Sequence, residues 1–142
     1  MRLFLDANIL FLAGYSATSP VHDLLSLAGA GDCELVSSEY AFEEARRNLE
    51  LKVDASAVAA MISATHMVVR VNEAAAPAVH IAQATALSDR ADIPILAAAI
   101  QSAVDALVTG DRRAFGDYFG SRLAGIRIMR LRDALNEILA AK

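Results

Sequence analysis

Five short apolar runs recur along this chain of 142 residues, and a helical pattern separates each run from the next. Continuous apolar runs of this length are typical of strands that are buried on both faces of a parallel sheet. Strands that alternate with helices are joined by right-handed crossovers, which cover the faces of the sheet with helices. The pattern therefore predicts an α/β fold, with strands at residues 2–5, 34–37, 67–71, 106–109 and 127–131.

Prolines and capping residues indicate where the helices begin. Pro20 and Pro77 each suit the first turn of a helix, where the missing N–H is harmless, and Asp54 suits an N-cap. The predicted helices cover 20–29, 39–51, 54–65, a segment from 77 and a segment from 93, with short helical turns after 113 and from 133 to 142. Because no repeat, low-complexity segment or linker interrupts this series, we predict a single domain over residues 1–142.

Composition narrows the classes of function. The net charge is −4, which argues against a protein that coats nucleic acid, because such proteins carry a surplus of Lys and Arg. An acidic site that binds divalent cations is compatible with this charge. The single cysteine cannot form an internal disulfide, and the N-terminus lacks the pattern of a secretion signal. The charge-free apolar stretches, such as 93–104, are too short to span a bilayer. These features predict a soluble cytoplasmic protein with no membrane partner.

Acidic residues follow two of the predicted strands directly. Asp6 comes after the first strand and Asp111 after the fourth. In an open parallel sheet, ligands bind beyond the carboxyl ends of the strands, at the point where the strand order reverses. If these two strands are neighbours there, the two carboxylates face each other across one crevice. Glu43 and Glu44, on the helix after the second strand, and Asp92, at the start of the helix before the fourth, can reach the same crevice.

Each of these acids except Asp6 also has an ordinary structural explanation, as a helix cap, a turn residue or part of a solvated face. An acid directly after a buried strand is costly unless it is paired or metal-bound, so Asp6 is the strongest single indication of a site. Other α/β enzymes fit less well. The chain lacks a phosphate-binding loop and a dinucleotide-binding glycine motif. A dehalogenase-type phosphatase would need Asp in place of Asn8, and a receiver domain would need Asp directly after the third strand.

Four segments together resemble the PIN domain family of small metal-dependent nucleases: LDANIL (5–10), EEARRNL (43–49), DIPILAAA (92–99) and ALVTGD (106–111). The resemblance covers essentially the whole chain in the correct order, and VTGD after an Ala-rich helix is its most specific part. It implies a three-layer α/β/α fold with a five-stranded parallel sheet in the order 3-2-1-4-5. It also implies an acidic site for Mg²⁺ or Mn²⁺. The implied catalytic and metal-binding residues are Asp6, Glu44, Asp92 and Asp111, with Asn8 and Thr109 in support.

The alignment with the family leaves some of these assignments open. Glu43 is an alternative to Glu44 as the second acid of the site. Only one of them can point into the site, because one residue step turns a helix by about 100°. Asp89 competes more weakly with Asp92, and Asp117 is a candidate fifth acid.

Cationic and aromatic residues are candidates for contact with the substrate. Arg112 and Arg113 adjoin the crevice and are expected to bind substrate phosphates, although a solvated face explains them equally well. Tyr15, Tyr40 and Tyr118 have the chemistry to stack on bases, but we interpret these isolated aromatics as packing residues.

The function implied by the resemblance is that of a metal-dependent endoribonuclease. One or two cations held by carboxylates can activate water, stabilise charge on the phosphate and assist the leaving alkoxide. We expect Asp6 and Asp111 to bind the metal directly, whereas Glu44 and Asp92 would act through its water or in activating the nucleophile. The compact build resembles the toxin half of a bacterial toxin–antitoxin pair, which implies an RNA substrate, a cognate antitoxin and a homodimer. A housekeeping RNA-processing nuclease and a PIN-like module that binds RNA or protein without cutting are the alternatives.

Overall fold

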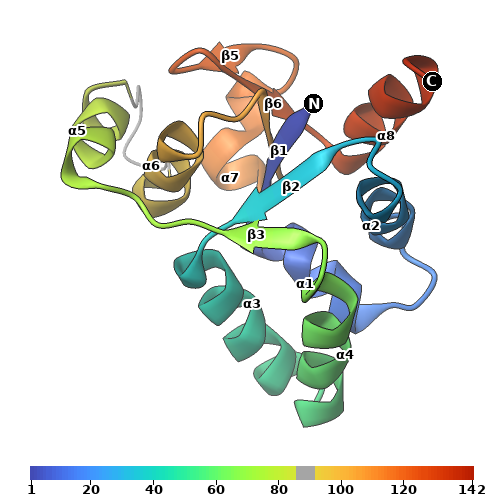
Figure 1. Ribbon diagram of the computed structural model, residues 1–142. Helices are drawn as coiled ribbons and strands as arrows, with labels where there is room; N and C mark the ends of the chain where they lie inside the picture. Colours follow the sequence, from blue (N-terminus) through green and yellow to red (C-terminus); the bar gives the residue numbers. More distant parts are fainter. Residues whose placement is uncertain (86–91) are drawn as a thin grey trace.

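A mainly parallel sheet of six strands runs through the centre of the molecule in the order β3-β2-β1-β4-β6-β5 (Figure 1). The structure is a computed structural model, and it describes residues 1–85 and 92–142. Only β5 runs antiparallel to its neighbour in this sheet, which confirms the predicted α/β class. The strands are β1 (Arg2–Leu5), β2 (Glu34–Ser37), β3 (Val69–Val71), β4 (Ala106–Val108), β5 (Arg122–Leu123) and β6 (Ile126–Met129).

The predicted order 3-2-1-4-5 is confirmed for the parallel strands, because the fifth predicted strand is β6 and it lies beside β4. The predicted number of strands is wrong, since a hairpin adds β5 to the edge of the sheet. A strand of two residues is too short to show a hydrophobic period. Ala124 and Gly125 form the hairpin turn, and both have positive φ, as a two-residue type I′ turn requires. The last parallel strand also ends earlier than predicted, because α8 begins at Leu131.

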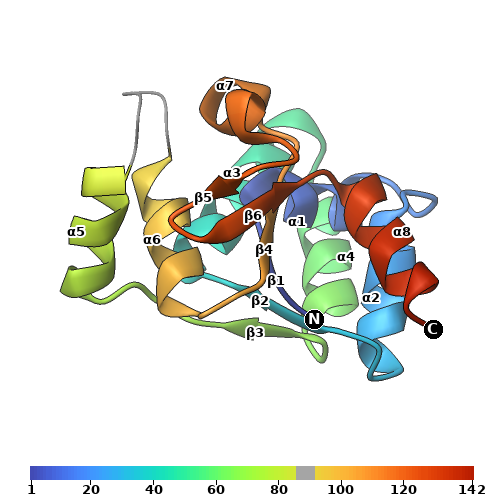
Figure 2. The same cartoon turned by 90° about the horizontal axis from the view of Figure 1, so that it is seen from above.

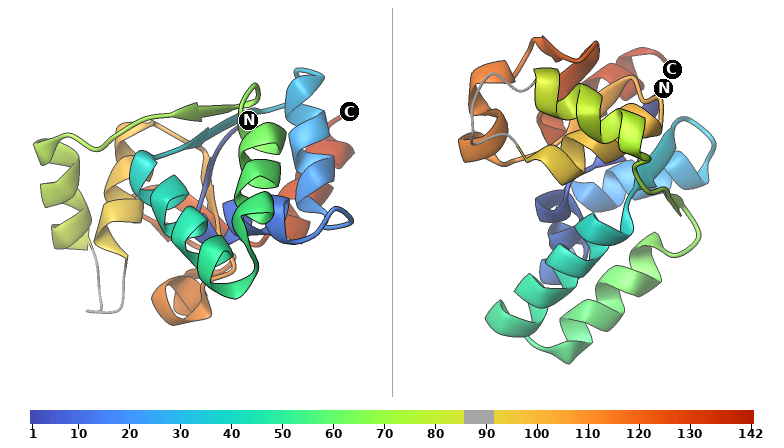
Figure 3. Two further views of the ribbon diagram at one scale, coloured as in Figure 1. Left: turned by 90° about the horizontal axis from the view of Figure 1, so that it is seen from below. Right: turned by 90° about the vertical axis from the view of Figure 1, so that its left-hand side faces the viewer.

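Helices cover both faces of the sheet. Figure 3 shows α5 and α6 on one side of the sheet and α1 to α4 on the other, and Figure 2 shows α8 beside α2. Among the helices that the structure describes, none combines the length and the apolar character needed to cross a membrane. The helices are α1 (Ala7–Tyr15), α2 (Val21–Gly29), α3 (Glu39–Lys52), α4 (Ala55–Thr65), α5 (Ala76–Thr85), α6 (Ile93–Gln101), α7 (Arg112–Phe115) and α8 (Leu131–Ala140), with a 3₁₀ turn η1 (Gly116–Tyr118) after α7.

Helix α1 follows β1 directly and was not among the predicted helices. Its sequence ANILFLAGY is apolar almost throughout, so it shows no helical alternation of polar and apolar residues. The structure gives the reason, because α1 packs against both α3 and α4. At Gly14, α1 and α4 are too close for a side chain, because an added Cβ atom would lie 2.3 Å from the backbone oxygen of Ala57 on α4.

The carboxyl ends of β1 and β4 lie side by side, because Leu5 pairs in register with Val108. The backbone N–H of Asp6 donates to the carbonyl of Val108 at 3.0 Å, and that of Thr109 donates to the carbonyl of Met129 at 3.0 Å. The residues that leave these two strands are therefore held by the sheet itself. This edge of the sheet carries the acidic residues considered next.

Candidate functional site

Asp6 is the N-cap of α1 and is buried, with 2% of its surface exposed. One of its carboxylate oxygens accepts a hydrogen bond from the backbone N–H of Ala7 at 2.6 Å. The other accepts from the Thr109 hydroxyl at 2.7 Å and from the Asn8 amide at 3.5 Å. Burial raises the pKa of the Asp6 carboxyl to about 6, because it outweighs the hydrogen bonds from Thr109 and Ala7 that favour the charged form. The nearby charges of other acids raise this pKa further.

Asn8 and Thr109, the two residues expected to support the site, link the loops that follow β1 and β4. The side-chain oxygen of Asn8 accepts from the backbone N–H of Gly110 at 2.9 Å. The Thr109 hydroxyl donates to Asp6 and accepts from the backbone N–H of Asp111 at 3.0 Å. Asp111 in turn caps α7, with one oxygen accepting from the N–H of Ala114 at 3.0 Å. Asp6 and Asp111 are thus fixed relative to each other by hydrogen bonds through Thr109.

Glu44 and Glu43 are adjacent on α3 but point in different directions. Glu44 is half-buried and lies beside Asp6 and Asp92. Glu43 is exposed and forms an ion pair with Arg46 on its own helix. The geometry therefore distinguishes the two candidates, and Glu44 is the one that faces the other acids.

Asp92 is half-buried and caps α6, where one oxygen accepts from the N–H of Ile95 at 3.4 Å. Its structural explanation as an N-cap is thus correct, yet the same carboxylate also faces the other acids. Burial raises the pKa of the Asp92 carboxyl to about 6, and the charges of Glu44 and Asp111 raise it too. Its competitor Asp89 lies outside the described residues.

Three of the predicted acids form one tight cluster. Asp6, Glu44 and Asp92 each offer a carboxylate oxygen, and these oxygens lie within 4.8 Å of one another. Asp111 lines the same cavity of about 230 Å³ but stands outside this group of three. Carboxylates at such distances repel one another unless a proton or a cation neutralises them. An all-oxygen donor set of this kind fits Mg²⁺ or Mn²⁺, which prefer carboxylate and water ligands.

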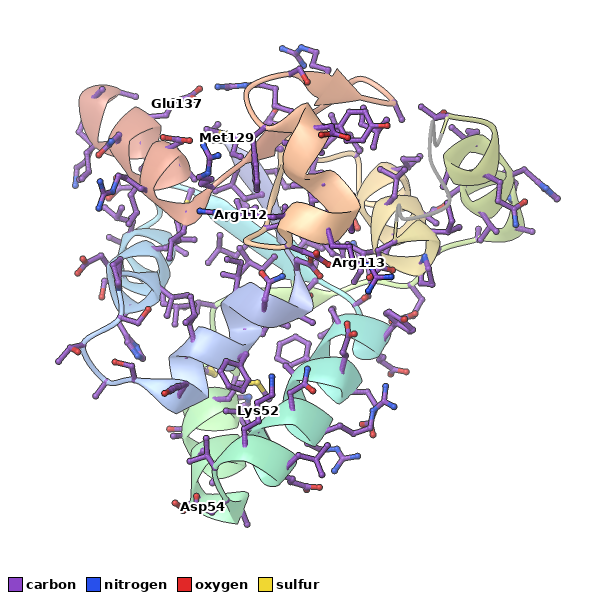
Figure 4. All side chains as sticks on the ribbon, turned by 180° about the vertical axis from the view of Figure 1, so that it is seen from behind. Lys52, Asp54, Arg112, Arg113, Met129 and Glu137 are labelled. Atoms are coloured by element: carbon purple, nitrogen blue, oxygen red, sulfur yellow. The ribbon has the colours of Figure 1, made fainter. Side chains whose placement is uncertain are left out.

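Other predicted site residues do not line this cavity. Arg112 and Arg113 are exposed on α7, and Figure 4 shows them on different sides of that short helix, with Arg112 turned toward α8. Asp117 is exposed in the turn η1. Contact of the two arginines with substrate stays a prediction.

Three residues that the sequence analysis did not single out share the cavity with the acids: Phe11 on α1, and Asn48 and Lys52 on α3. Asn48 and Lys52 follow Glu44 at steps of four residues, so all three lie on one face of the helix. This spacing would have identified them once Glu44 was assigned to the site. The Lys52 ammonium lies 5.7 Å from the centroid of the Phe11 ring, and Figure 4 shows Lys52 between α1 and α3.

Two of the three tyrosines that we interpreted as packing residues are exposed. Tyr15 is 56% exposed and Tyr40 is 42% exposed, whereas Tyr118 is partly buried against the core. Tyr40 lies near the acidic cluster: burial and the negative charges of Asp92 and Glu44 raise the pKa of its hydroxyl.

Comparison with known proteins agrees with this architecture. A family model described as PIN domain matches residues 2–113, which include all four predicted acids. No curated protein matches the chain significantly. The chain therefore belongs to the PIN domain family, whose members are generally nucleases and typically use divalent metals.

Proposed function

We propose that this chain is a metal-dependent nuclease that hydrolyses phosphodiester bonds in RNA at the cluster of Asp6, Glu44 and Asp92. The observation that carries the proposal is the convergence of these carboxylates, which come from three segments far apart in the sequence, within 4.8 Å of one another. Burial of such a cluster at the carboxyl edge of the sheet is unfavourable by itself, since it raises the pKa of two of the three carboxyls to about 6. A divalent cation is the simplest species that compensates this cost.

The three clustered carboxylates would hold the metal, with Asp111 at the edge of the cavity. When bound, a divalent cation supplies Lewis-acid chemistry that makes water more acidic and polarises a phosphoryl oxygen. The protein fixes Asp6 most firmly, because both of its oxygens accept hydrogen bonds. Glu44 would offer one carboxylate oxygen to the metal. Because it accepts no hydrogen bond from the described residues, its other oxygen would be available to orient a water and take its proton. Asp92 keeps one oxygen on its helix cap and presents the other to the cavity.

Cleavage of labelled single-stranded RNA in Mg²⁺ or Mn²⁺, with EDTA as the metal-free control, tests this proposal. Asp6→Asn and Glu44→Gln should each slow cleavage by at least about 100-fold, since each removes a charge from the cluster. Asp54→Asn is the matched control, because Asp54 is an exposed cap of α4 on another part of the molecule (Figure 4). A folded wild type that binds RNA but cuts no substrate with either metal would favour the non-catalytic module.

The biological role that we propose is that of the toxin in a toxin–antitoxin pair, with housekeeping RNA processing as the alternative. A cognate antitoxin and a homodimer stay predictions from the resemblance. Expression of the wild type in bacterial cells should arrest growth if the chain is a toxin, and Asp6→Asn should relieve the arrest. Normal growth with an active nuclease would favour the housekeeping role.

A further inference from the structure

The surface next to the acidic cluster has a chemical character that metal binding alone does not explain. On α3, Glu44, Asn48 and Lys52 lie on one face at steps of four residues, so the face changes from acid to amide to cation as it leaves the cluster. Eight residues of helix correspond to about 12 Å along the axis. Lys52 is therefore displaced from the metal-binding end of the cavity and is not placed to act on the reacting phosphate.

A second row of side chains runs beside the first, on α1. Phe11 lines the cavity with the acids, and Tyr15 follows it by four residues at the end of the helix. Their ring centroids are 5.3 Å apart, with the ring planes inclined at 50°. Because α1 packs against α3, the two rows adjoin, and the Lys52 ammonium lies 5.7 Å from the centroid of the Phe11 ring.

Lys52 has no carboxylate partner among the described residues, and the same holds for Arg47 on α3 and for Arg112 and Arg113 on α7. Of these four cations, Lys52 is the one that lines the cavity with the acids. Arg46, on the same helix, pairs with Glu43 and Glu50 on a different face. Lys142, the other lysine of the chain, pairs with Asp32 at 3.0 Å. The Lys52 ammonium lines the acidic cavity, and the exposed Tyr15 ring adjoins Phe11 of the same cavity. An ammonium and an aromatic ring so placed are suited to a ligand that carries both phosphates and flat apolar groups.

We propose that Phe11, Tyr15, Asn48 and Lys52, here called the α1–α3 track, bind the single-stranded part of the polynucleotide that flanks the phosphodiester to be cut. Lys52 binds a backbone phosphate, Asn48 offers its amide to the nucleotide between that phosphate and the cluster, and Tyr15 stacks on a base. The inference rests on the proposed function, because it assigns the track to the substrate of the acidic cluster. It makes these four residues positioning residues, which act on affinity and not on the chemical step.

Binding of a fluorescently labelled single-stranded RNA in EDTA tests the track without cleavage. Lys52→Ala should weaken binding several-fold and lower the slope of log affinity against log salt by about 0.7, the value for one phosphate contact on a single strand. Lys52→Arg should restore both. Lys142→Ala is the matched control and should change neither, because Lys142 lies with Asp32 near the amino end of β2, away from the acids. Tyr15→Ala should weaken binding about fivefold, whereas Tyr15→Phe, which keeps the ring, should bind normally.

Kinetics separate a positioning role from a catalytic one. On a long RNA, Lys52→Ala should raise KM with little change in kcat. A dinucleotide is too short to reach from Glu44 to Lys52. On this substrate Lys52→Ala should change neither KM nor kcat.

Any of three results would overturn the track. If Lys52→Ala binds RNA with the same affinity and the same salt dependence as the wild-type protein, no phosphate lies against Lys52. Tighter Mg²⁺ binding by Lys52→Ala, with RNA affinity unchanged, would show that Lys52 only offsets the acidic charge. The proposed function fails separately: a chain that binds RNA through Lys52 but cuts nothing in Mg²⁺ or Mn²⁺ supports the track and refutes the nuclease. A chain that cuts RNA equally well with and without Lys52 refutes the track alone.

Discussion

Replacing Asp6 by Asn should make the metal-free protein more stable at neutral pH, although it removes a residue of the proposed active site. The pKa of the Asp6 carboxyl rises from 3.8 to about 6 on folding, chiefly because the group is buried. A tenfold change in an ionisation equilibrium is worth about 1.4 kcal/mol, so the charged carboxylate costs the folded state about 3 kcal/mol. Asn carries no charge and avoids this cost.

The substitution also loses part of the hydrogen bonding at this position. Asn keeps an oxygen for the N–H of Ala7 but turns an NH₂ group toward Thr109, whose hydroxyl oxygen already accepts from Asp111. One lost hydrogen bond costs about 1 kcal/mol. The expected net gain in the free energy of unfolding is therefore about 2 kcal/mol at neutral pH.

The pH dependence of the free energy of unfolding checks separately whether the Asp6 charge destabilises the folded state. Because the folded state binds the Asp6 proton more tightly than the unfolded state, the wild type should lose stability as the pH rises from 3.8 to about 6. It should stay less stable above that range. Asp6→Asn should show a smaller loss, with the remainder coming from Asp92, whose carboxyl pKa is also raised.

Urea unfolding in EDTA across this pH range, followed by circular dichroism, measures these quantities. Asp54→Asn is the control: hydrogen bonds from Ser56 and Ala57 lower the pKa of the exposed Asp54 carboxyl, so removing its charge should not stabilise the protein. If Asp6→Asn is less stable than wild type at neutral pH, and wild-type stability does not fall through the stated window, folding does not raise the pKa of the Asp6 carboxyl and the reasoning is refuted. Added Mg²⁺ should stabilise the wild type and not Asp6→Asn.

Three further predictions concern packing, the choice between adjacent acids, and pH. Gly14→Ala should destabilise the protein by at least about 1–3 kcal/mol, because its Cβ would lie 2.3 Å from the Ala57 oxygen; thermal unfolding measures this. Glu44→Gln should weaken Mn²⁺ binding by about 10–100-fold in calorimetry, whereas Glu43→Gln, on the exposed face, should leave it unchanged. Metal affinity of the wild type should fall as the pH drops below about 6, because protons compete for the two cluster carboxyls with raised pKa.

A specific result would contradict each of these three predictions. Gly29→Ala, where the nearest atom would be 3.7 Å from the new Cβ, should be tolerated far better than Gly14→Ala, and equal losses would argue against the close contact of α1 with α4. Equal effects of the two glutamine substitutions would mean that α3 does not present Glu44 alone to the cluster. Metal affinity that is constant across the acidic range would show that the cluster carboxyls are already charged there.

Local sequence was sufficient for the fold class and for the placing of two acids. An apolar run predicts a buried strand from its own composition, and Asp6 and the TGD segment follow such runs directly, so their place at the carboxyl edge needed no knowledge of distant contacts. The caps at Asp54 and Asp92 were readable for the same reason, since a cap depends on the few residues that follow it.

Elements whose signal is not local were missed or misjudged. Helix α1 has no apolar stripe because it packs against both α3 and α4, and β5 exists only because β6 offers it a pairing edge. The exposure of Tyr15 and Tyr40 likewise depends on which neighbours cover them, which composition does not state.

The site itself was decided by the tertiary structure. Glu43 and Glu44 are equivalent in sequence, and the rotation of α3, set by burial of Ala41, Ala45 and Leu49, turns only one of them toward Asp6. The same rotation brings Lys52 into the cavity. The hydrogen bond that holds Asp6 comes from Thr109, 103 positions away, through the register of β1 with β4. The residue types and their order along the chain were thus present in the sequence, whereas distance, burial and charge arise only when the strands pair and the helices pack.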